Sequence, residues 1–240
     1  MKHLHHTFDT AEQNLACDEV LLDLCEDGFE DEILRLWEPQ IPFVVLGYSN
    51  KIRDEVAINS CKSLAIPILR RTSGGGTVIQ GPGCLNYSLI LKIPPTESPL
   101  SSLTGTNKTI LERICRALSP LLSEEPCIQG TSDLTLRNLK FSGNAQRRKK
   151  QALLFHGTLL LNMDLSLISQ CLQAPPRQPD YRQNRPHAEF VTNLGLNSTV
   201  VKKVLREVWG CSEELTTLPM PAIEKLVREK YSKPEWNEKF

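Results

Sequence analysis

The sequence contains no long apolar run, no excess of charge of either sign and no closely spaced pair of cysteines. No stretch approaches the roughly 18 apolar residues that a membrane-spanning helix needs. The N-terminus, MKHLHHTFDT, lacks the apolar core of a secretory signal. Lys plus Arg and Asp plus Glu number 28 each, so no overall field would recruit nucleic acid or an anionic membrane. We therefore expect a cytoplasmic protein that binds neither nucleic acid nor membranes.

The eight cysteines do not follow the spacing of a metal site. No C-x-x-C pair occurs, which argues against a zinc ribbon. Most of the cysteines lie in apolar periodic segments, where a free thiol behaves as a small hydrophobic side chain. His3, His5 and His6 cluster at a terminus that we expect to fray, so we assign no metal ligands there. Reduced, mostly structural thiols are expected.

The pattern of apolar residues predicts a mixed set of strands and helices. Hydrophobic residues make up 40% of the 240 residues and charged residues 23%, which suits one sizeable core. Strands are predicted at 33–37, 43–47, 66–69, 77–80, 85–93, 133–136, 139–141 and 152–163, and helices at 10–27, 54–64, 107–122, 198–209 and 220–231. Four prolines exclude regular structure in 175–186. The grouped strands favour an α+β fold, a mixed or antiparallel sheet packed with helices, in a single domain over 1–240.

The segment RRTSGGGTVIQGPGCLNYS, residues 70–88, is a candidate binding loop between two strands. Gly74, Gly75 and Gly76 let the backbone adopt positive φ and let a ligand approach bare amides. Arg70 and Arg71 carry permanent charge on forked donors that suit carboxylates and phosphates. A plain glycine turn with two solvated arginines is the alternative. The flanking apolar segments favour a loop that binds phosphate and acid groups.

A second candidate segment runs from Asp133 to Thr158. Lys140 lies between two apolar residues in a predicted strand, so its amine can point into a cleft or belong to an exposed edge strand. Ser142-Gly143-Asn144 is predicted to form a turn whose backbone could approach a ligand. His156 precedes Gly157 in an apolar strand, a setting that is also typical of a core histidine.

Five segments, in this order along the chain, resemble the lipoate-protein ligase A family, within the wider group of biotin and lipoate ligases and octanoyltransferases. They are NLACDEVLL, LRLWEPQIPFVVLGYSNK, RRTSGGGTV, DLTLRNLKFSGNAQRR with HGTLL, and KYSKPEWN. The resemblance implies the catalytic-domain fold of that group. It also implies a lipoate-protein ligase, which activates lipoate or octanoate with ATP as acyl-AMP and transfers it to a lysine of a carrier domain.

The resemblance implies roles for individual residues. Lys140 would be catalytic, with hydrogen bonds to the acyl carbonyl and a phosphate oxygen, and Arg71 would contact the nucleotide phosphates. The implied ATP and acyl-adenylate site comprises Arg71, Ser73, Gly74, Gly75, Gly76, Thr77, Val78, Ile79, Lys140, Gly143, His156 and Gly157. The expected acyl pocket consists of Trp37, Val44, Leu46 and Tyr87. ATP with Mg²⁺ is the expected cofactor and lipoate the substrate, with no metal ligands assigned in the chain.

The resemblance also implies protein partners. The carriers would be lipoyl domains of 2-oxoacid dehydrogenase complexes or the H protein of glycine cleavage. Such domains are small and acidic, so the basic run Arg147–Lys150 is a candidate docking patch, or else a solvated face. Gln80-Gly81 and Cys84 depart from the family's usual His-Asp and Asn. The small C-terminal accessory domain of many bacterial ligases is not expected here, so a separate accessory subunit is a candidate partner.

Other functions compete with the ligase. An octanoyltransferase of the same fold would take an activated thioester and use a cysteine nucleophile, Cys127 or Cys84, without ATP. A biotin ligase is disfavoured because its Gly-Arg-Gly-Arg loop is absent. A non-catalytic lipoyl-domain binder would not need Arg71, the glycines and Lys140 together. The intact RRTSGGG segment and the lysine followed by Ser-Gly-Asn favour the ligase.

Overall fold

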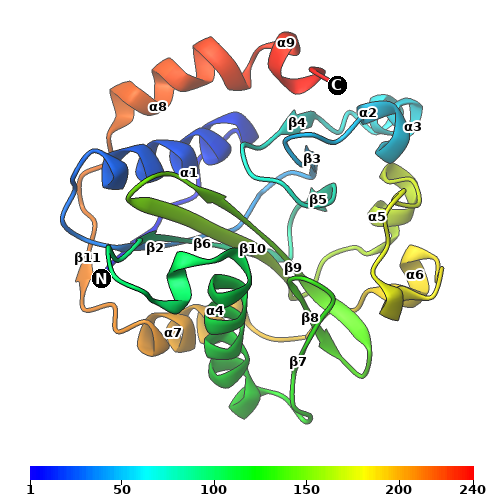
Figure 1. Cartoon of the computed structure of the whole chain (residues 1–240). Coiled ribbons are helices and arrows are strands. Elements are labelled where there is room, and N and C mark those ends of the chain that lie inside the picture. The colour runs from blue at the N-terminus through cyan, green and yellow to red at the C-terminus, as the bar shows by residue number, and fades with distance from the viewer.

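The computed structural model describes residues 1–240 and contains two β-sheets with helices around them (Figure 1). The eight-stranded sheet has the order β11-β1-β2-β6-β10-β9-β8-β7, and the three-stranded sheet has the order β4-β3-β5. Strand β1 runs parallel to β2 and β11, and β3 parallel to β4, while the other neighbours are antiparallel. The predicted α+β fold with mixed sheets is confirmed.

The bounds of the elements are as follows. The strands are β1 (Lys2–His5), β2 (Ile33–Trp37), β3 (Phe43–Leu46), β4 (Ile68–Arg70), β5 (Val78–Gln80), β6 (Cys84–Lys92), β7 (Cys127–Gln129), β8 (Asp133–Leu136), β9 (Leu139–Arg148), β10 (Ala152–Leu160) and β11 (Glu213–Glu214). The helices are α1 (Ala11–Glu26), α2 (Ile52–Glu55), α3 (Ile58–Ser63), α4 (Leu103–Leu118), α5 (Ser166–Cys171), α6 (His187–Phe190), α7 (Ser198–Val208), α8 (Met220–Leu226) and α9 (Pro234–Asn237). A π-helix, Val227–Tyr231, continues α8.

Helices cover both faces of the large sheet. In Figure 1, α1 and α8 lie above it and α4 and α7 below it. One apolar cluster lies between the large sheet and helices α1 and α8. A second lies between the opposite face of that sheet and helices α4 and α7, and a third joins the small sheet to α3 and α5. Along β6 the apolar residues at 85, 87, 89 and 91 face α4 and α7. Because strand residues alternate, Asn86 and Ser88 face the opposite side, toward the small sheet.

The structure differs from the predicted elements in local ways. The N-terminus does not fray, because β1 is hydrogen-bonded between β2 and β11. Residues 54–64 form two helices, since Val56 is extended and bridges to Leu172. Helix α4 begins at Leu103 because the Ser102 side chain caps it. Strand β9 continues through the predicted turn at Ser142–Asn144. None of the helices combines the length and apolarity that crossing a membrane requires.

Candidate functional site

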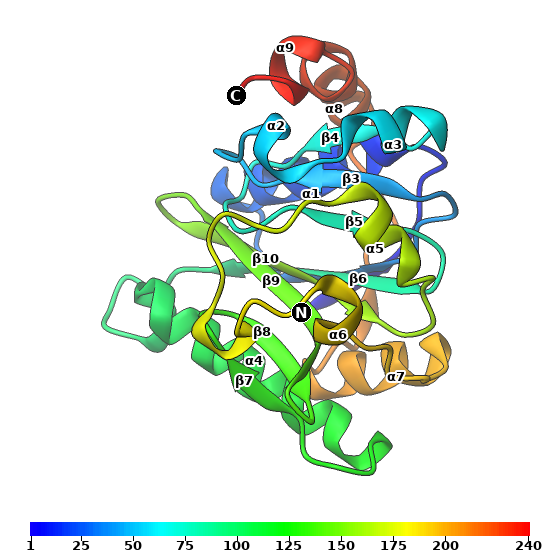
Figure 2. The same cartoon turned by 90° about the vertical axis from the view of Figure 1, so that its right-hand side faces the viewer.

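A cavity of about 540 Å³ lies between the small sheet and the face of the large sheet that carries Asn86 and Ser88. The glycine loop and β5 form one wall, and the centres of β6, β9 and β10 form the other. Residues 172–191, which we call the strap, contribute a third wall. Figure 2 shows the strap (yellow) running from α5 to α6 across the side on which both sheets are visible.

Most of the predicted site residues line this cavity. They are Trp37, Arg71, Gly75, Gly76, Thr77, Val78, Ile79, Tyr87, Lys140, Gly143, His156 and Gly157. Ser73 lies behind the cavity wall and Gly74 is exposed on the loop. Val44 and Leu46 face the cluster with α3 and α5 instead, and Val45 between them lines the cavity. The alternation of strand side chains makes Val45 the β3 residue that an acyl chain could contact.

Arg71 shapes the glycine loop from the inside. Its Nη2 donates to the carbonyl oxygens of Gly74 at 2.6 Å and Gly76 at 2.8 Å, and its Nε donates to the Ser73 hydroxyl at 3.0 Å. Gly75 between them has φ +87°, a conformation that favours glycine. Burial lowers the pKa of Arg71 to about 10, so the guanidinium stays charged at neutral pH. The loop therefore curls around a fixed positive charge that faces the cavity.

Arg70, also predicted to bind acids or phosphates, has a structural role. Its side chain is fully buried outside the cavity, and its guanidinium donates only to main-chain carbonyls. These are the carbonyls of Gly47, Tyr48, Asn50, Trp236 and Asn237, at 2.8–3.1 Å. The guanidinium thus ties the strand that enters the glycine loop to the β3–α2 connection and to α9.

Two further contacts fix the loop. Glu55 on α2 accepts hydrogen bonds from the backbone N–H of Thr77 at 3.1 Å and from Asn50 Nδ2 at 2.7 Å. A side chain at Gly47 would overlap the carbonyl oxygen of Gly75, so only glycine allows the β3–α2 connection to approach so closely. The glycine loop is therefore held in place before any ligand arrives.

Lys140 reaches the cavity from an interior strand through a β-bulge. Strand β9 lies between β8 and β10, so the edge-strand interpretation does not apply. Thr135 pairs with Lys140 and Leu134 with Ser142, which leaves Phe141 as an extra residue on β9. A bulge re-aims side chains. Lys140 Nζ lies 2.7 Å from Asp133 Oδ1 and would be 3.0 Å from a Cβ on Gly143.

His156 belongs to a chain of polar contacts that runs from α1 to the glycine loop. Arg35 Nη1 donates to Asp18 Oδ1 at 2.6 Å, and both side chains are buried. Ser88 donates to the other Asp18 oxygen at 2.7 Å, and His156 Nδ1 lies 3.6 Å from it. His156 Nε2 and the Ser73 hydroxyl are 2.6 Å apart. His156 is therefore both a satisfied interior histidine and a cavity residue.

Asp18 is ionised within this chain. Burial alone would raise the pKa of Asp18, but the charge of Arg35 and the hydrogen bonds from His156 and Ser88 outweigh it, so the pKa lies below its usual value. Asp18 and Arg35 therefore form a buried ion pair. Removing either side chain alone would leave the other charge buried without a counter-charge.

None of the eight cysteines lines the cavity. Cys84 is buried, its thiol donates to the Met163 sulfur at 3.1 Å, and burial raises its pKa to about 12. Cys127 is exposed on β7, the edge strand of the large sheet. A thiol at either position would need a rearrangement of the protein to reach a substrate in the cavity.

The sequence prediction missed several cavity residues. Gln80 Nε2 donates to the Thr158 hydroxyl at 3.1 Å, and that hydroxyl donates to Asn86 Oδ1 at 2.6 Å. Gln80 Oε1 and Asn86 Nδ2 are buried without partners, so they can bond to a ligand or water. The apolar alternation of β6 was the available signal, because it places Asn86 on the other face. No sequence signal distinguished Asp18 and Asp133 from surface acids.

The described residues contain no group of three or more His, Cys, Asp or Glu side chains that could hold a metal ion. The three carboxylates of the cavity, Asp18, Glu55 and Asp133, are each engaged by protein groups. The side chains around the cavity therefore do not form an all-protein magnesium site.

Comparisons with known proteins give the family to which this fold and cavity belong. A family model described as the lipoyl protein ligase A/B catalytic domain matches residues 10–204. The chain therefore belongs to the lipoyl protein ligase A/B catalytic-domain family.

Similar proteins within this family carry two different activities. A "Lipoate--protein ligase 1" of Staphylococcus aureus (strain Mu50 / ATCC 700699) is 29% identical over 236 residues, 93% of this chain and 69% of that protein. An "Octanoyltransferase LipM" of Oceanobacillus iheyensis is 28% identical over 206 residues, 80% of this chain and 75% of that protein. The chain is thus an enzyme of the lipoate ligase and octanoyltransferase family.

Solved structures agree with the fold. A bi-partite lipoate protein ligase from Thermoplasma acidophilum, studied with its E2 lipoyl domain, has a TM-score of 0.82 at 23% identity, over 99% of this chain and 96% of that one. A lipoate-protein ligase A bound with ATP has a TM-score of 0.79 at 24% identity, over 99% of both chains. At these identities the likeness shows the shared fold.

Proposed function

We propose that this protein is a lipoate–protein ligase. It would activate lipoate, or octanoate, with ATP as acyl-AMP and transfer the acyl group to a lysine of a lipoyl carrier domain. One observation carries the proposal: Lys140 and the charged glycine loop share a cavity that no cysteine lines. An enzyme that forms a covalent acyl-cysteine needs a thiol there, whereas an adenylating enzyme needs cations and amides.

The first step would join the acid to AMP. A carboxylate oxygen of lipoate attacks the α-phosphorus of ATP, and pyrophosphate leaves. Negative charge accumulates around phosphorus in the transition state, where preorganised donors lower the barrier. The positive charge of Arg71, the amides around Gly75 and the amine of Lys140 are the groups available for this. A solved relative of this fold is bound with ATP, which supports the nucleotide.

The second step would be aminolysis. The uncharged amine of the carrier lysine attacks the acyl carbonyl and an amide bond forms. The bond from the acyl carbon to the phosphate oxygen breaks, AMP leaves as the anion, and the proton lost by the amine passes to water. Lys140 would donate to the carbonyl oxygen as it gains charge. Trp37 and Val45 offer apolar surface for the acyl chain.

Magnesium would accompany ATP rather than occupy a site built by the protein. Mg²⁺ is commonly held by substrate phosphates with one or two carboxylates. Asp133 and Glu55 line the cavity near Lys140 and Thr77, but both are already bonded there. Any carboxylate that met the ion would have to exchange one of these bonds.

The proposed partner is a lipoyl domain, consistent with the Thermoplasma ligase that was studied with its own. Within the predicted docking patch, Arg148 is committed to Leu100 and Thr106, and Lys149 pairs with Asp23 at 2.6 Å. Arg147 and Lys150 remain exposed and would carry the docking. We also propose that residues 1–240 act as one domain in the cytoplasm.

The alternative is an octanoyltransferase, favoured by the similarity to the Oceanobacillus enzyme. Its nucleophile would be Cys127, the exposed candidate, or Cys84, the buried one. Catalysis by Cys127 would require β7 to move toward the cavity.

Intact-mass measurement of a lipoyl domain separates the two activities. One reaction contains the protein, lipoate, ATP and magnesium, and another contains octanoyl carrier protein without ATP. We expect modification in the first only, abolished in Lys140→Ala and retained in Cys127→Ala and Cys84→Ala. Modification only in the second, lost in a cysteine variant, would overturn the ligase. If both reactions fail, preformed lipoyl-AMP tests transfer alone.

A further inference from the structure

The strap contributes one side chain that bonds to the partner of the proposed catalytic lysine. The hydroxyl of Tyr181 donates to Asp133 Oδ2 at 2.7 Å, while Lys140 Nζ lies 2.7 Å from Asp133 Oδ1. The carboxylate is thus held at both oxygens, by a neutral donor from the strap and by the charged amine. A carboxylate with both oxygens engaged has a fixed plane, and so it gives the lysine tip a defined direction.

The surroundings leave the lysine tip little other support. A Cβ on Gly143 would lie 3.0 Å from both Cε and Nζ of Lys140, so the missing side chain there makes room for the tip without binding it. The β-bulge at Phe141 lifts Lys140 out of the regular pleat. Asp133 is the one ion-pair partner of the amine, with the two side chains 14% and 26% exposed respectively.

The strap is itself anchored where Tyr181 leaves it. The Tyr181 ring packs on the Phe190 ring with centroids 5.2 Å apart. The Arg182 guanidinium lies over the Phe190 ring, with its Cζ 4.6 Å from the ring centroid. Gly130, at φ +56°, lies under the strap, and a Cβ there would be 3.2 Å from Pro179 and 3.5 Å from the Tyr181 ring. The hydroxyl therefore has a fixed position from which to orient Asp133.

The strap also binds the backbone of the lysine. Thr192 N–H, just after the strap, donates to the carbonyl of Lys140 at 2.9 Å, and Val191 forms a bridge with the same residue. The main chain of Lys140 is therefore hydrogen-bonded to this segment directly, and its amine is linked to the segment through Asp133. A displacement of this segment would move both together.

We propose that Tyr181 is a positioning residue, which acts through Asp133 to aim the Lys140 amine into the cavity. The inference rests on the proposed function for its effect on catalysis, but its effect on the amine does not. Loss of the hydroxyl frees one carboxylate oxygen, lets the carboxylate rotate, and lets the lysine tip leave its direction. Because the ring keeps its packing in Tyr181→Phe, the fold is expected to stand.

The test measures the chemical accessibility of the Lys140 amine and the kinetics of the reaction in separate experiments. Competitive acetylation with trace acetic anhydride, read by peptide mass spectrometry, reports how accessible Lys140 is relative to exposed Lys108. In Tyr181→Phe we expect the Lys140 labelling ratio to rise several-fold. In whichever acyl-transfer reaction the protein supports, kcat should fall roughly tenfold, while KM for ATP or acyl donor changes less than threefold.

Controls and a second variant keep the outcomes decisive. Tyr48→Phe removes a hydroxyl outside the cavity that bonds Lys239, and should change neither measurement. In Asp133→Asn, adding Tyr181→Phe should have almost no further effect, since both act through one carboxylate. Unchanged labelling in Tyr181→Phe, or additive effects of the two substitutions, would overturn the inference. A protein inactive in every reaction but with increased labelling would contradict only the proposed function.

Discussion

At the scale of single residues, the glycine at 143 controls where the amine of Lys140 can lie. An added Cβ would sit 3.0 Å from the flexible end of Lys140, and the next nearest atom, Asp133 Oδ1, would be 3.9 Å away. The lysine tip would yield, so Gly143→Ala should leave the melting temperature nearly unchanged. Its transfer rate should fall by roughly 10- to 100-fold, because small misplacements of reacting groups cost that much. Thermal unfolding beside intact-mass kinetics checks the pair of outcomes; a stable variant with normal rate would contradict it.

The buried pair of Asp18 and Arg35 makes the opposite prediction, on stability. Asp18→Asn leaves the guanidinium buried without its counter-charge, which should destabilise the fold by about 3–5 kcal/mol. Urea unfolding at pH 7 measures it, with Asp164→Asn, an exposed acid, as control.

Acid should weaken the wild type through the same group. The pKa of Asp18 is depressed in the folded protein, so its stabilisation is complete above the unfolded value near 3.9. It is lost as pH falls through the lower folded value. Urea midpoints between pH 5 and pH 2 should therefore fall more steeply in wild type than in Asp18→Asn. If the urea midpoints of the two proteins fall equally with pH, Asp18 does not contribute to the acid sensitivity.

At the scale of elements, the strap should respond to pH through His187. Burial lowers the pKa of His187; the hydrogen bond to the Gln173 carbonyl opposes this, and the positive charges of Arg182 and Lys140 add to it, so the pKa lies below its usual value. The neutral ring donates from Nε2 to the carbonyl of Gln173, and its Nδ1 faces Arg182 Nη2 at 3.4 Å. The folded strap disfavours the charged ring, so its stability is complete above the unfolded pKa near 6.5 and falls as pH drops below it.

Hydrogen exchange of the strap checks this dependence. Protection of amides in 180–190, corrected for intrinsic rates, should fall between pH 7.5 and pH 5.5, while protection of the β6–β10 pair stays constant. His187→Gln can keep a donor to Gln173 without titrating, and should flatten the profile. A profile identical to wild type in that variant would point to another titrating group.

The same scale separates what sequence reasoning could predict from what it could not. Alternation along 85–91 predicted β6, and helical spacing predicted α1, because each pattern reflects burial of one face. The predicted strand at 139–141 is the start of β9, but the bulge at Phe141 carries no such pattern, and so the continuation of β9 to Arg148 and the direction of Lys140 could not be predicted. Arg70 and Arg71 are adjacent and chemically identical, yet alternation sends one to main-chain carbonyls and the other into the loop. Val45 was missed because the sequence does not show which face of β3 meets the cavity.

At the scale of the whole molecule, nucleotide binding should stabilise the fold. A ligand that binds only the native state adds about 2.7 kcal/mol at a concentration of 100 Kd. For a chain of this size that corresponds to a rise in melting temperature of roughly 5–10 °C. We expect ATP with magnesium to produce such a shift in wild type and a smaller one in Lys140→Ala. No shift at millimolar ATP would favour the transferase.

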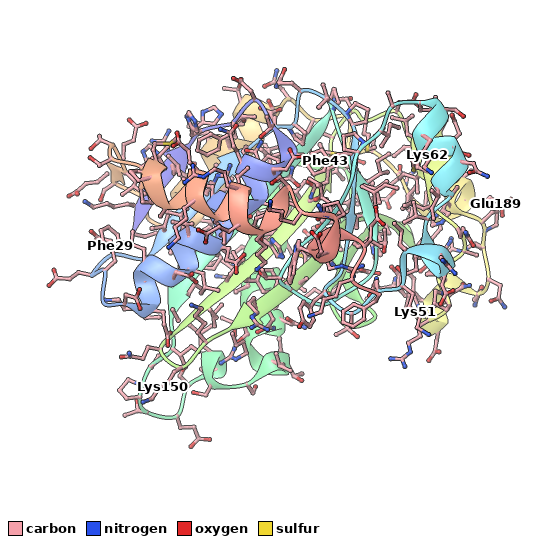
Figure 3. The ribbon with its side chains drawn as sticks, turned by 90° about the horizontal axis from the view of Figure 1, so that it is seen from above. Phe29, Phe43, Lys51, Lys62, Lys150 and Glu189 are labelled. Carbon is pink, nitrogen blue, oxygen red and sulfur yellow. The ribbon has the colours of Figure 1, made fainter.

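The proposed docking of a carrier domain would depend on charges at the molecular surface. Figure 3 places Lys150 at the tip of the β9–β10 turn, at the opposite end from Lys51 and Lys62. The double variant Arg147→Glu, Lys150→Glu should raise KM for an acidic lipoyl domain several-fold, more at low salt, and leave adenylate formation unchanged. The charge-matched control, Lys108→Glu with Arg116→Glu on α4, should do neither. Equal effects of both doubles would indicate net charge rather than a patch.

The choice of partners made by Arg70 has a consequence for how relatives of this protein can vary. All five acceptors of its guanidinium are main-chain carbonyls, which every amino acid supplies. Substitution at Tyr48, Asn50 or Trp236 therefore leaves the acceptors in existence, whereas inserting or deleting one residue shifts a carbonyl out of register. We expect the spacing of these segments to be preserved among relatives more strictly than their residue identities. The anchoring of the glycine loop therefore depends on the lengths of these segments more than on the identities of their residues.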